Sequence, residues 1–293
     1  MPWLQLRINC EPEVASRCES ALLGNGALSV TFEDNAHQPI FEPELGETPL
    51  WNETRVTGLF EADIDTQLIE TRIAKALTRK KVHLYWHVLE DKDWEREWMS
   101  HYTPIQCHER LWVCPSWCEP PKPDAINLLL DPGLAFGTGT HPTTFLCLQW
   151  LAEQKLSQSH VVDYGCGSGI LGIAALLLGA RHVDGVDIDP QALLATQDNV
   201  QRNGLDKMQF PVYFPEKYHT VKHDFVLANI LAGPLVELAP TLIELLKPGG
   251  KICLSGVLKV QEQSIIEAYK DAINIEGIKQ KEEWICFTGT KKV

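Results

Sequence analysis

The sequence predicts an α/β fold in which a large domain with a mostly parallel sheet follows a smaller α+β domain. In residues 105–293, apolar segments of strand length alternate with segments of helical periodicity, which is the pattern of a parallel sheet covered by helices. Residues 1–90 show the order strand, helix, strand, strand, helix, strand, which is typical of a ferredoxin-like domain. A chain of 293 residues also reaches the upper size of a single core. We therefore expect domains at 1–90 and 105–293, joined by a linker at 91–104.

The first domain is expected to be strongly acidic. Its strands are expected at residues 3–9, 27–32, 55–60 and 82–89, and its helices at 11–23 and 66–77. Residues 1–65 carry three basic and twelve acidic side chains, so 3 minus 12 gives −9 of the −13 net charge of the chain. Such a surface repels nucleic acid and membrane phosphates. It is either an ordinary solvated face or a docking face for a basic partner.

The linker is a charged and aromatic segment. Residues 90–102 contain no glycine or proline, and the next proline is Pro104. Trp94 and Trp98 are four residues apart and would lie on one face of a helix. We interpret this segment as a helical connector.

A glycine-rich stretch organises the second domain. Residues 161–169 read Val-Val-Asp-Tyr-Gly-Cys-Gly-Ser-Gly and continue into an apolar helical segment. This pattern predicts a strand, a sharp turn and a helix start, because glycine lets the backbone approach a ligand closely. Gly167, Gly169 and Gly172 also match the dinucleotide fingerprint Gly-x-Gly-x-x-Gly, which would place a pyrophosphate at the helix start.

Two acids help to choose between the possible cofactors. Asp163 lies two residues before Gly165, where a carboxylate suits the ammonium and sulfonium of S-adenosylmethionine better than a diphosphate. The alternation of Gly165, Gly167 and Gly169 is also tighter than the dinucleotide pattern. Asp187 follows Gly165 by 22 residues, the distance at which a carboxylate can bind ribose hydroxyls for either cofactor. We therefore expect the S-adenosylmethionine loop of a Rossmann-like methyltransferase.

Two further polar segments are expected beside this loop. Residues 130–144 form a glycine-threonine loop that ends at Pro142, a residue favoured in the first turn of a helix. The threonines of this loop are placed to hydrogen-bond a carboxylate or amine at the helix start. His141 is either a base or, as is more common beside a helix start, a structural hydrogen-bond partner. Asn229 ends a buried strand, in the crevice where doubly wound sheets bind their ligands.

The rest of the second domain alternates strands and helices. Helices are expected at 143–154, 170–178, 191–203, 235–246 and 260–272. Strands are expected at 111–113, 126–130, 182–189, 209–214, 224–230 and 251–255, with a turn at 247–250 and a final strand pair through residue 287. Together with the strand before Gly165, these elements predict a seven-stranded, mostly parallel sheet.

The cysteines and the amino-terminus indicate the compartment. Nine cysteines, an odd number without a Cys-x-x-Cys pair, are typical of a reduced, intracellular protein. Cys107, His108, Cys114 and Cys118 lie close in sequence, but their spacing matches no common zinc pattern, so no metal site is expected. There is no signal-peptide pattern and no segment apolar enough to span a membrane. We therefore expect a soluble, cytoplasmic protein.

Several of these motifs occur together in one known family. In chain order they are Gly-Thr-Gly-Thr-His-Pro-Thr-Thr, Asp-Tyr-Gly-Cys-Gly-Ser-Gly-Ile-Leu, Val-Asp-Ile-Asp-Pro, Ala-Asn-Ile-Leu-Ala-Gly-Pro and Lys-Pro-Gly-Gly. With this ordered set the chain closely resembles the PrmA family over nearly its whole length. The resemblance implies an enzyme that uses S-adenosylmethionine to methylate amino groups, the α-amine and lysine side chains, of the basic ribosomal protein eleven of the large subunit. That partner would be free or on the ribosome, and the amino-terminal domain would recognise it.

The resemblance also assigns roles to residues. It implies that Thr144, Gly165, Asp187 and Asn229 bind the cofactor, and Gly167, in the same glycine loop, is expected to bind it as well. The glycine loop would approach the methionine part, Asp187 the ribose and Thr144 the amino-acid end. Asn229 is also expected to be catalytic, because its side-chain oxygen would orient the incoming neutral amine.

Three other functions stay open at the level of sequence. A nucleotide-dependent oxidoreductase would share the fold and the acid at Asp187. A methyltransferase for RNA or a small molecule would share the cofactor loop, although the acidic first domain disfavours RNA. A noncatalytic ribosome-binding factor could keep the fold, but it would have no need of an intact Asp187 and Asn229.

Overall fold

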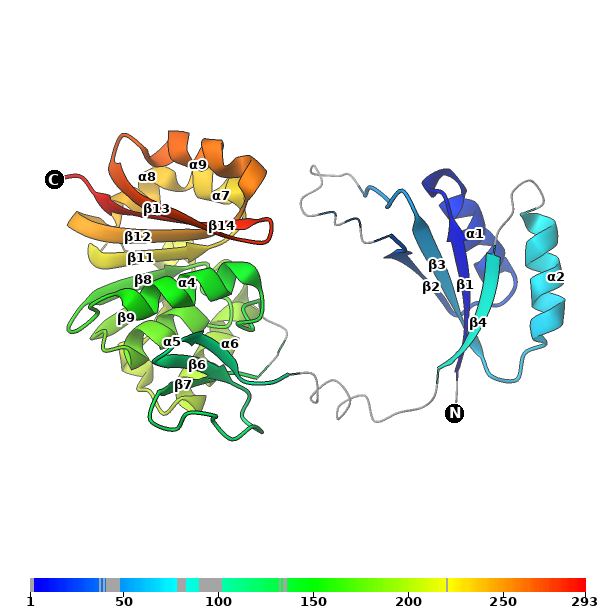
Figure 1. Ribbon diagram of the computed structural model, residues 1–293, viewed down its shortest axis with the longest axis horizontal. Helices are drawn as coiled ribbons and strands as arrows, with labels where there is room; N and C mark the ends of the chain where they lie inside the picture. The colour runs from blue at the N-terminus through cyan, green and yellow to red at the C-terminus, as the bar shows by residue number, and fades with distance from the viewer. Residues whose placement is uncertain are drawn as a thin grey trace. The chain divides into compact units, whose positions relative to one another are not determined.

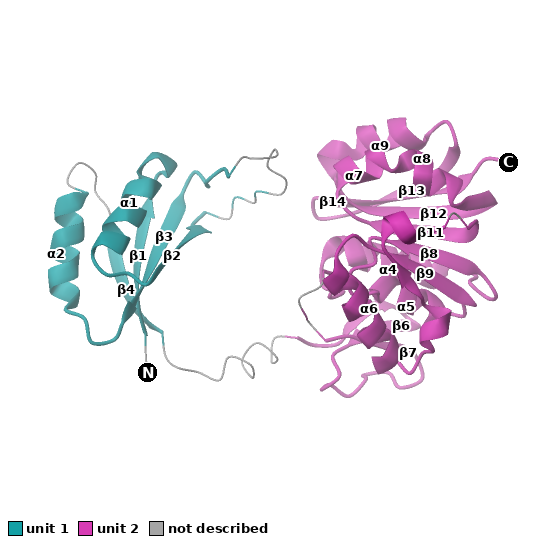
Figure 2. Ribbon diagram, turned by 180° about the vertical axis from the view of Figure 1, so that it is seen from behind, with its two compact units in different colours: residues 1–99 teal, residues 100–293 magenta. Residues whose placement is uncertain are grey.

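The chain folds into two compact units, residues 1–99 (unit 1) and residues 100–293 (unit 2) (Figures 1 and 2). The structure, a computed structural model, describes residues 3–36, 38, 40, 48–77, 83–89, 102–131, 133, 136–219 and 221–293. The helical connector predicted at 91–104 lies outside these residues up to residue 101. Residues 102–104 are described and are not helical.

Unit 1 has the ferredoxin-like arrangement that the sequence predicts. Its elements are β1 (Trp3–Cys10), α1 (Pro12–Gly24), β2 (Ser29–Asp34), β3 (Thr54–Glu61), α2 (Thr66–Ala76) and β4 (His83–Leu89). The strands form one antiparallel sheet in the order β2-β3-β1-β4, so the two strands that follow a helix lie at its edges. Leu6 and Phe60 of the sheet and Leu22 and Ile73 of the helices are buried together. Burial of this apolar face against the helices stabilises the unit.

Unit 2 contains a small sheet and a large sheet. Its strands are β5 (Ile105–His108), β6 (Leu111–Cys114), β7 (Ile126–Leu129), β8 (His160–Tyr164), β9 (His182–Val186), β10 (Val212–Tyr213), β11 (His223–Asn229), β12 (Leu246–Leu258), β13 (Ile273–Lys281) and β14 (Trp284–Lys291). The large sheet has the order β10-β9-β8-β11-β12-β14-β13, and β14 is antiparallel to both neighbours whereas the first five strands are parallel. The predicted seven-stranded, mostly parallel sheet is confirmed.

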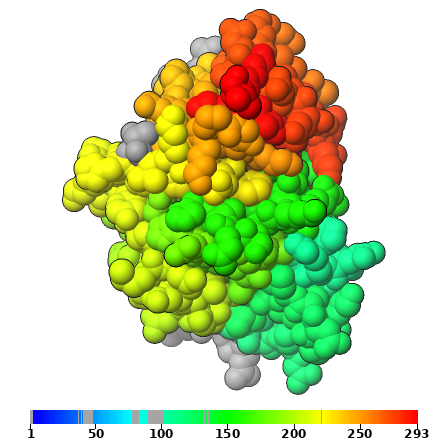
Figure 3. All heavy atoms as spheres, turned by 90° about the vertical axis from the view of Figure 1, so that its left-hand side faces the viewer, coloured from blue at the N-terminus to red at the C-terminus, as the bar shows by residue number. Residues whose placement is uncertain are grey.

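Helices cover both faces of the large sheet. They are α4 (Pro142–Glu153), α5 (Ile170–Leu177), α6 (Pro190–Arg202), α7 (Ala232–Glu237), α8 (Ala239–Glu244) and α9 (Glu262–Tyr269), with short 3-10 helices at Lys207–Gln209, Pro215–Lys217 and Lys259–Gln261. Side chains of α4, α5 and α6 belong to one buried core, and those of α7, α8 and α9 to a second. In the space-filling view of unit 2, the C-terminal segments (orange to red) gather at the upper end and the blue-green segment near β5 to β7 lies at the lower right (Figure 3).

The strand order reverses between β8 and β11. From β8 the chain proceeds to β9 and β10 on one side, and from β11 it proceeds to β12 on the other. In doubly wound sheets, the carboxyl ends of the strands beside such a reversal form a crevice that binds ligands. Gly165 follows β8, Asp187 follows β9, and Asn229 is the last residue of β11.

Several elements differ from the sequence prediction. The short strand β5 was missed, because the four residues Ile-Gln-Cys-His are too short a run for their alternation to identify a strand. The helix predicted at 235–246 is two helices, since Pro240 lacks the N–H that would continue the hydrogen bonding. The turn predicted at 247–250 lies inside β12, where Leu246 pairs with His223 and Lys251 with Phe225, so the extra residues form a bulge.

A close contact between α5 and β9 makes a testable prediction. Gly172 lies on α5, and a Cβ there would lie 2.2 Å from Cζ of Phe210 and 2.9 Å from Cγ1 of Val183. Phe210 and Val183 are fully buried. We expect Gly172→Ala to lower the free energy of unfolding, because overpacking costs about 1–3 kcal/mol, which exceeds the roughly 1 kcal/mol that alanine gains in a helix. Urea denaturation followed by far-UV circular dichroism measures the loss.

The double variant Gly172→Ala/Phe210→Leu is the control for this contact. A smaller side chain at position 210 makes room for the new methyl group, so the double variant should lose less than the sum of the two single losses. Strictly additive losses would show that the two residues do not press on each other.

Candidate functional site

A cavity of about 610 Å³ lies at the carboxyl ends of β8, β9 and β11. It is lined by Phe136, His141, Thr143, Tyr164, Gly165, Gly167, Val186, Asp187, Ile188, Pro215, Asn229, Ile230, Leu231, Pro234, Glu237, Leu238, Gly256 and Trp284. Four of the five residues predicted to bind a cofactor are in this set, namely Gly165, Gly167, Asp187 and Asn229. Thr144 is not. The site therefore lies where the strand order of the sheet predicts it.

The glycine loop forms the floor of the cavity because it lacks side chains. Gly165 has φ +77° and Gly167 has φ +54°. Residues other than glycine rarely adopt this backbone conformation. A Cβ on Gly165 would lie 2.2 Å from Cγ2 of Ile230, and one on Gly167 would lie 2.7 Å from the carbonyl oxygen of Phe136. The loop can therefore hold a ligand close to its backbone only with glycine at both positions.

Helix α6 and the residue after Gly167 fix this loop. Thr196 Oγ1 donates to the carbonyl oxygen of Gly167 (3.0 Å), and Asn199 Nδ2 donates to that of Ser168 (2.8 Å). Ser168 in turn bonds the segment that precedes α4, since its Oγ donates to the carbonyl oxygen of Gly137 (2.7 Å) and its N–H to that of Phe136 (2.9 Å). Two segments about 30 residues apart in sequence are thus joined beside the cavity.

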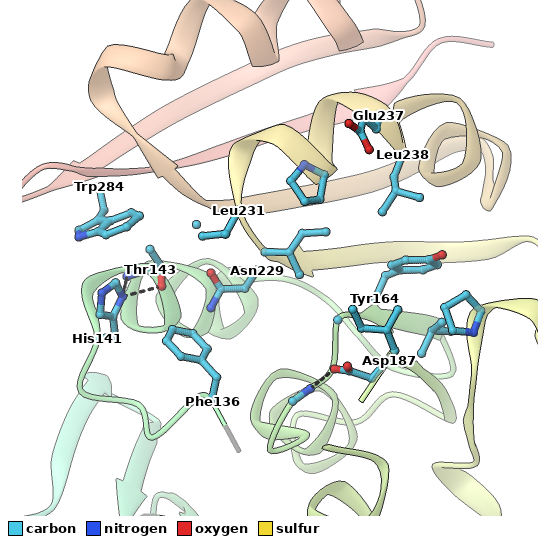
Figure 4. Close-up of a pocket in the computed structure, with 18 residues that line it drawn as sticks. Phe136, His141, Thr143, Tyr164, Asp187, Asn229, Leu231, Glu237, Leu238 and Trp284 are labelled. Carbon is cyan, nitrogen blue, oxygen red and sulfur yellow. Dashed lines mark hydrogen bonds between the residues drawn. The ribbon is translucent and has the colours of Figure 1, made fainter. Parts of the chain in front are cut away.

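Asp187 is held with its carboxylate at the cavity. Its Oδ2 accepts from the N–H of Gly167 (2.9 Å; Figure 4), and its Oδ1 accepts from the N–H of Asp189 (3.0 Å). Each carboxylate oxygen has two lone pairs, so each can accept one more hydrogen bond. The geometry suits two neighbouring hydroxyl groups of a ribose.

Asp163 lies beneath the loop and does not line the cavity. The sequence interpretation placed this carboxylate facing the ligand, but Asp163 is 1% exposed and its Oδ2 accepts from the N–H of Gly172 (2.9 Å). Burial raises the pKa of Asp163 to about 7, although the Gly172 hydrogen bond opposes this rise; the nearby charge of Asp187 adds to it. The alternation of the strand explains the difference, because Asp163 points away from the end of β8 into the start of α5.

Asn229 links the cavity to α4. Its Nδ2 donates to Thr144 Oγ1 (3.2 Å), whereas its buried Oδ1 has no hydrogen-bond partner among the described residues. Thr144 is fully buried, and its neighbour Thr143 is the threonine that lines the cavity. Successive residues of a helix point in directions about 100° apart, which separates the two. The orphaned oxygen of Asn229 is therefore the acceptor that a ligand can use.

An aromatic wall closes the same end of the cavity. The ring of His141 lies 5.7 Å from that of Phe136 and 4.9 Å from that of Trp284, both edge to face. Nδ1 of His141 lies 2.8 Å from Thr143 Oγ1 and accepts from the Thr143 N–H at 3.4 Å, so His141 caps α4. Burial lowers the pKa of His141. From the sequence, His141 could be a base or a structural hydrogen-bond partner, and these contacts agree with the structural role.

The cavity thus has two different ends (Figure 4). Asp187 and the glycine loop offer hydrogen-bond acceptors and exposed backbone at one end. Asn229 lies at the other end together with the rings of Phe136, His141 and Trp284. Phe136 lies in the predicted loop at 130–144 but was not singled out there. Trp284 was not predicted, because a single aromatic residue far along the chain carries no signal of its position in the fold. An orphaned acceptor and a loop without side chains fit a nucleoside that carries an amino-acid group.

Comparison with known proteins gives the family. Residues 2–292 match the family model for ribosomal protein L11 methyltransferase (PrmA). The chain belongs to the PrmA family. It is therefore an S-adenosylmethionine-dependent methyltransferase, and the alternative of a nucleotide-dependent oxidoreductase is not supported.

Individual relatives cover the chain from end to end. It is 64% identical to the ribosomal protein L11 methyltransferase of Saccharophagus degradans over 292 residues, which cover all of both chains. It is 63% identical to that of Teredinibacter turnerae, over all of this chain and 98% of the relative. A solved structure, the ribosomal protein L11 methylase of Lactobacillus delbrueckii subsp. bulgaricus, is 32% identical with a TM-score of 0.59 and covers 66% of this chain and 100% of its own.

The position of Asp187 predicts its effect on cofactor binding. Asp187→Ala should weaken the binding of S-adenosylmethionine by more than tenfold, because each ribose hydroxyl loses a charged acceptor worth about 1.5–3 kcal/mol. Isothermal titration calorimetry measures the change. Asp189→Ala is the matched control, since Asp189 caps α6 through the Gln191 N–H and does not line the cavity. Equal affinity of wild type and Asp187→Ala would contradict the assignment.

The buried carboxyl of Asp163 predicts a pH dependence of stability. The folded chain holds the proton of Asp163 up to a pKa of about 7, whereas the ordinary value is 3.8. Its contribution to stability is full below pH ~3.8 and is lost as the pH rises through ~7, with a slope of up to about 1.4 kcal/mol per pH unit. Asp163→Asn keeps an acceptor for Gly172 and removes the titration, so its stability should fall less between pH 4.5 and 7.5 in urea denaturation. Parallel curves for the two proteins would rule out this titration.

Proposed function

We propose that this protein transfers methyl groups from S-adenosylmethionine to amino groups of ribosomal protein L11, both its α-amine and lysine side chains. The choice of an amino group as the methyl acceptor rests on Asn229. Its Oδ1 is a neutral, unpartnered acceptor at the aromatic end of the cavity. The names of the relatives support L11 as the substrate.

The chain's own residues suit the binding of the cofactor. When bound, S-adenosylmethionine supplies a methyl group on a positively charged sulfur. Gly165 and Gly167 allow its methionine part to lie against the backbone, and Asp187 accepts hydrogen bonds from its ribose. Thr144, predicted from the resemblance to contact the amino-acid end, holds the amide of Asn229 through its hydroxyl. This bond fixes the amide of Asn229 and leaves its Oδ1 without a partner among the described residues.

The accepting amine has to be neutral when it attacks. An α-amine has a pKa of about 8, so about a fifth is neutral at pH ~7.4, whereas a lysine with a pKa of about 10.4 is neutral about once in a thousand molecules. An uncharged acceptor such as Oδ1 of Asn229 orients an amine N–H without favouring the ammonium. The apolar rings of Phe136 and Trp284 reduce hydration there, which lowers the pKa of an amine. Orientation of this kind is worth about 7–11 kcal/mol of the barrier.

Mass spectrometry tests the substrate directly. The protein is incubated with isotope-labelled S-adenosylmethionine and either purified L11, whole large subunits or a mixture of ribosomal RNA. Label on the amino-terminal residue and on lysines of L11 is the expected result, and the first two samples compare free and ribosome-bound substrate. Label on RNA alone, or on no macromolecule, would reject the proposal. A substrate of this kind implies that the protein works in the cytoplasm.

We also propose that unit 1 recognises the substrate. Residues 1–65 hold most of the net negative charge, and L11 is a basic partner in this proposal. A chain that begins at Asp91 should still bind S-adenosylmethionine but should fail to methylate L11. Methylation by the full chain should weaken as salt rises, because exposed charges are screened beyond about 10 Å at 0.1 M. Full activity of the shortened chain would show that recognition lies elsewhere.

The role of Asn229 predicts a shift in the pH profile. In Asn229→Asp a carboxylate stabilises the unreactive ammonium, so the methylation rate should fall at neutral pH and its profile should move toward alkaline pH. Asn229→Ala should lose rate without this shift, because it adds no charge. Rates on L11 from pH 6.5 to 9.5 are compared for the three proteins. If Asn229→Asp and wild type keep parallel profiles, Asn229 does not face the amine.

A further inference from the structure

Three buried cysteines meet between α4 and the large sheet. Cys147 lies on α4, Cys253 on β12 and Cys286 on β14, and none is more than 1% exposed. Their sulfur atoms all lie within 4.8 Å of one another, and Sγ of Cys253 lies 3.4 Å from Sγ of Cys286. Among the residues that the structure describes, these three form the group with the spacing of a metal site. We call it the three-cysteine cluster.

A disulfide does not fit this cluster. Cys253 lies directly opposite Thr288 in the pairing of β12 with β14, so Cys286 is its diagonal neighbour. Diagonal neighbours in an antiparallel pair are about 7–8 Å apart, whereas a disulfide needs Cα atoms about 4.4–6.8 Å apart. A disulfide would also leave Cys147 unused. A single atom between the sulfurs fits better, since two sulfurs at about 2.3 Å from one tetrahedral ion lie about 3.8 Å apart.

Burial restricts the charge of such an atom. Three thiolates bring three negative charges into an apolar core, where uncompensated charge is costly. A monovalent ion leaves a charge of −2 and a divalent ion leaves −1, but a trivalent ion leaves a neutral complex. Because all three cysteines are buried, a neutral reagent that reacts with the thiols themselves is favoured. Thiolates select soft ions, and trivalent arsenic is a soft ion of the matching charge.

We propose that Cys147, Cys253 and Cys286 form a binding site for trivalent arsenic, which enters as arsenous acid. The reaction converts As(OH)₃ and three thiols into one As(S–Cys)₃ complex and three water molecules. Three As–O and three S–H bonds break, and three As–S and three O–H bonds form. No atom changes its oxidation state. The reagent and the complex are both neutral, so no charge has to enter the core.

The site is separate from the methyl-transfer cavity but close to it in the chain. Cys147 follows Thr143 by four residues on α4, and Cys286 follows Trp284 by two residues on β14. Bound arsenic therefore connects the helix and the strand that carry two residues of the cavity. Because the complex forms only in the folded chain, it stabilises that state in proportion to the concentration of arsenous acid.

The test uses the full chain, reduced and then incubated with arsenous acid. After removal of unbound reagent, inductively coupled plasma mass spectrometry should find one arsenic atom per chain. A sulfur-to-arsenic absorption band should appear in the near ultraviolet, and the midpoint of thermal unfolding should rise as the concentration increases. Loading should be slow, because fully buried thiols react only when the structure opens locally.

Single substitutions assign the bound arsenic to the cluster. Cys147→Ser, Cys253→Ser and Cys286→Ser should each reduce bound arsenic at least tenfold. Cys18→Ser is the matched control. Cys18 is also fully buried, but its thiol is hydrogen-bonded to that of Cys10 in unit 1. This variant should keep one arsenic atom per chain. Far-UV circular dichroism and titration with S-adenosylmethionine confirm that each variant folds, and Cys147→Ala replaces Cys147→Ser if the buried hydroxyl prevents folding.

Three results would overturn the proposal. The first is less than a tenth of an arsenic atom per wild-type chain, and the second is equal retention by wild type and a folded variant of Cys147. The third is displacement of arsenic by an equal concentration of Cd²⁺, which would show that the neutral charge of the complex does not decide which ion binds.

Discussion

The cavity depends on the close approach of three chain segments at the end of β8. Gly165 lies against Ile230, and Gly167 lies against the carbonyl of Phe136 while its N–H is bound by Asp187. None of these contacts leaves space for a Cβ. Since the glycines carry no side chain, the position of the ligand is set by backbone atoms and by residues from neighbouring strands, which are fixed by the parallel sheet.

The two ends of the cavity differ in charge. Asp187 offers a carboxylate at one end of the cavity, where a charged acceptor would strengthen hydrogen bonds to ribose hydroxyls. The opposite end has the neutral amide of Asn229 and aromatic rings. A second carboxylate, that of Asp163, is kept under the loop, where burial favours its protonated form. The carboxylates that line the cavity are those of Asp187 and Glu237, and that of Asp163 is not among them.

Short-range patterns of the sequence predicted much of this arrangement. The glycine loop, Asp187 and Asn229 lie at the ends of strands with clear hydrophobic runs. The sheet could therefore be predicted, and with it the place where these residues come together. Thr144 was placed by resemblance, but the direction of a side chain at a helix start depends on which turn faces the cavity, and Thr143 faces it instead. Trp284 meets His141, and Cys147 meets Cys253 and Cys286, across more than 100 residues of sequence, which only the folded chain brings together.

Ser168 belongs to the glycine loop and donates hydrogen bonds to the carbonyl oxygens of Phe136 and Gly137, so it joins two walls of the cavity. A cofactor that orders the first wall also orders the second, which carries part of the amine's surroundings. A change at Ser168 would therefore reach both the glycine loop and the ring of Phe136.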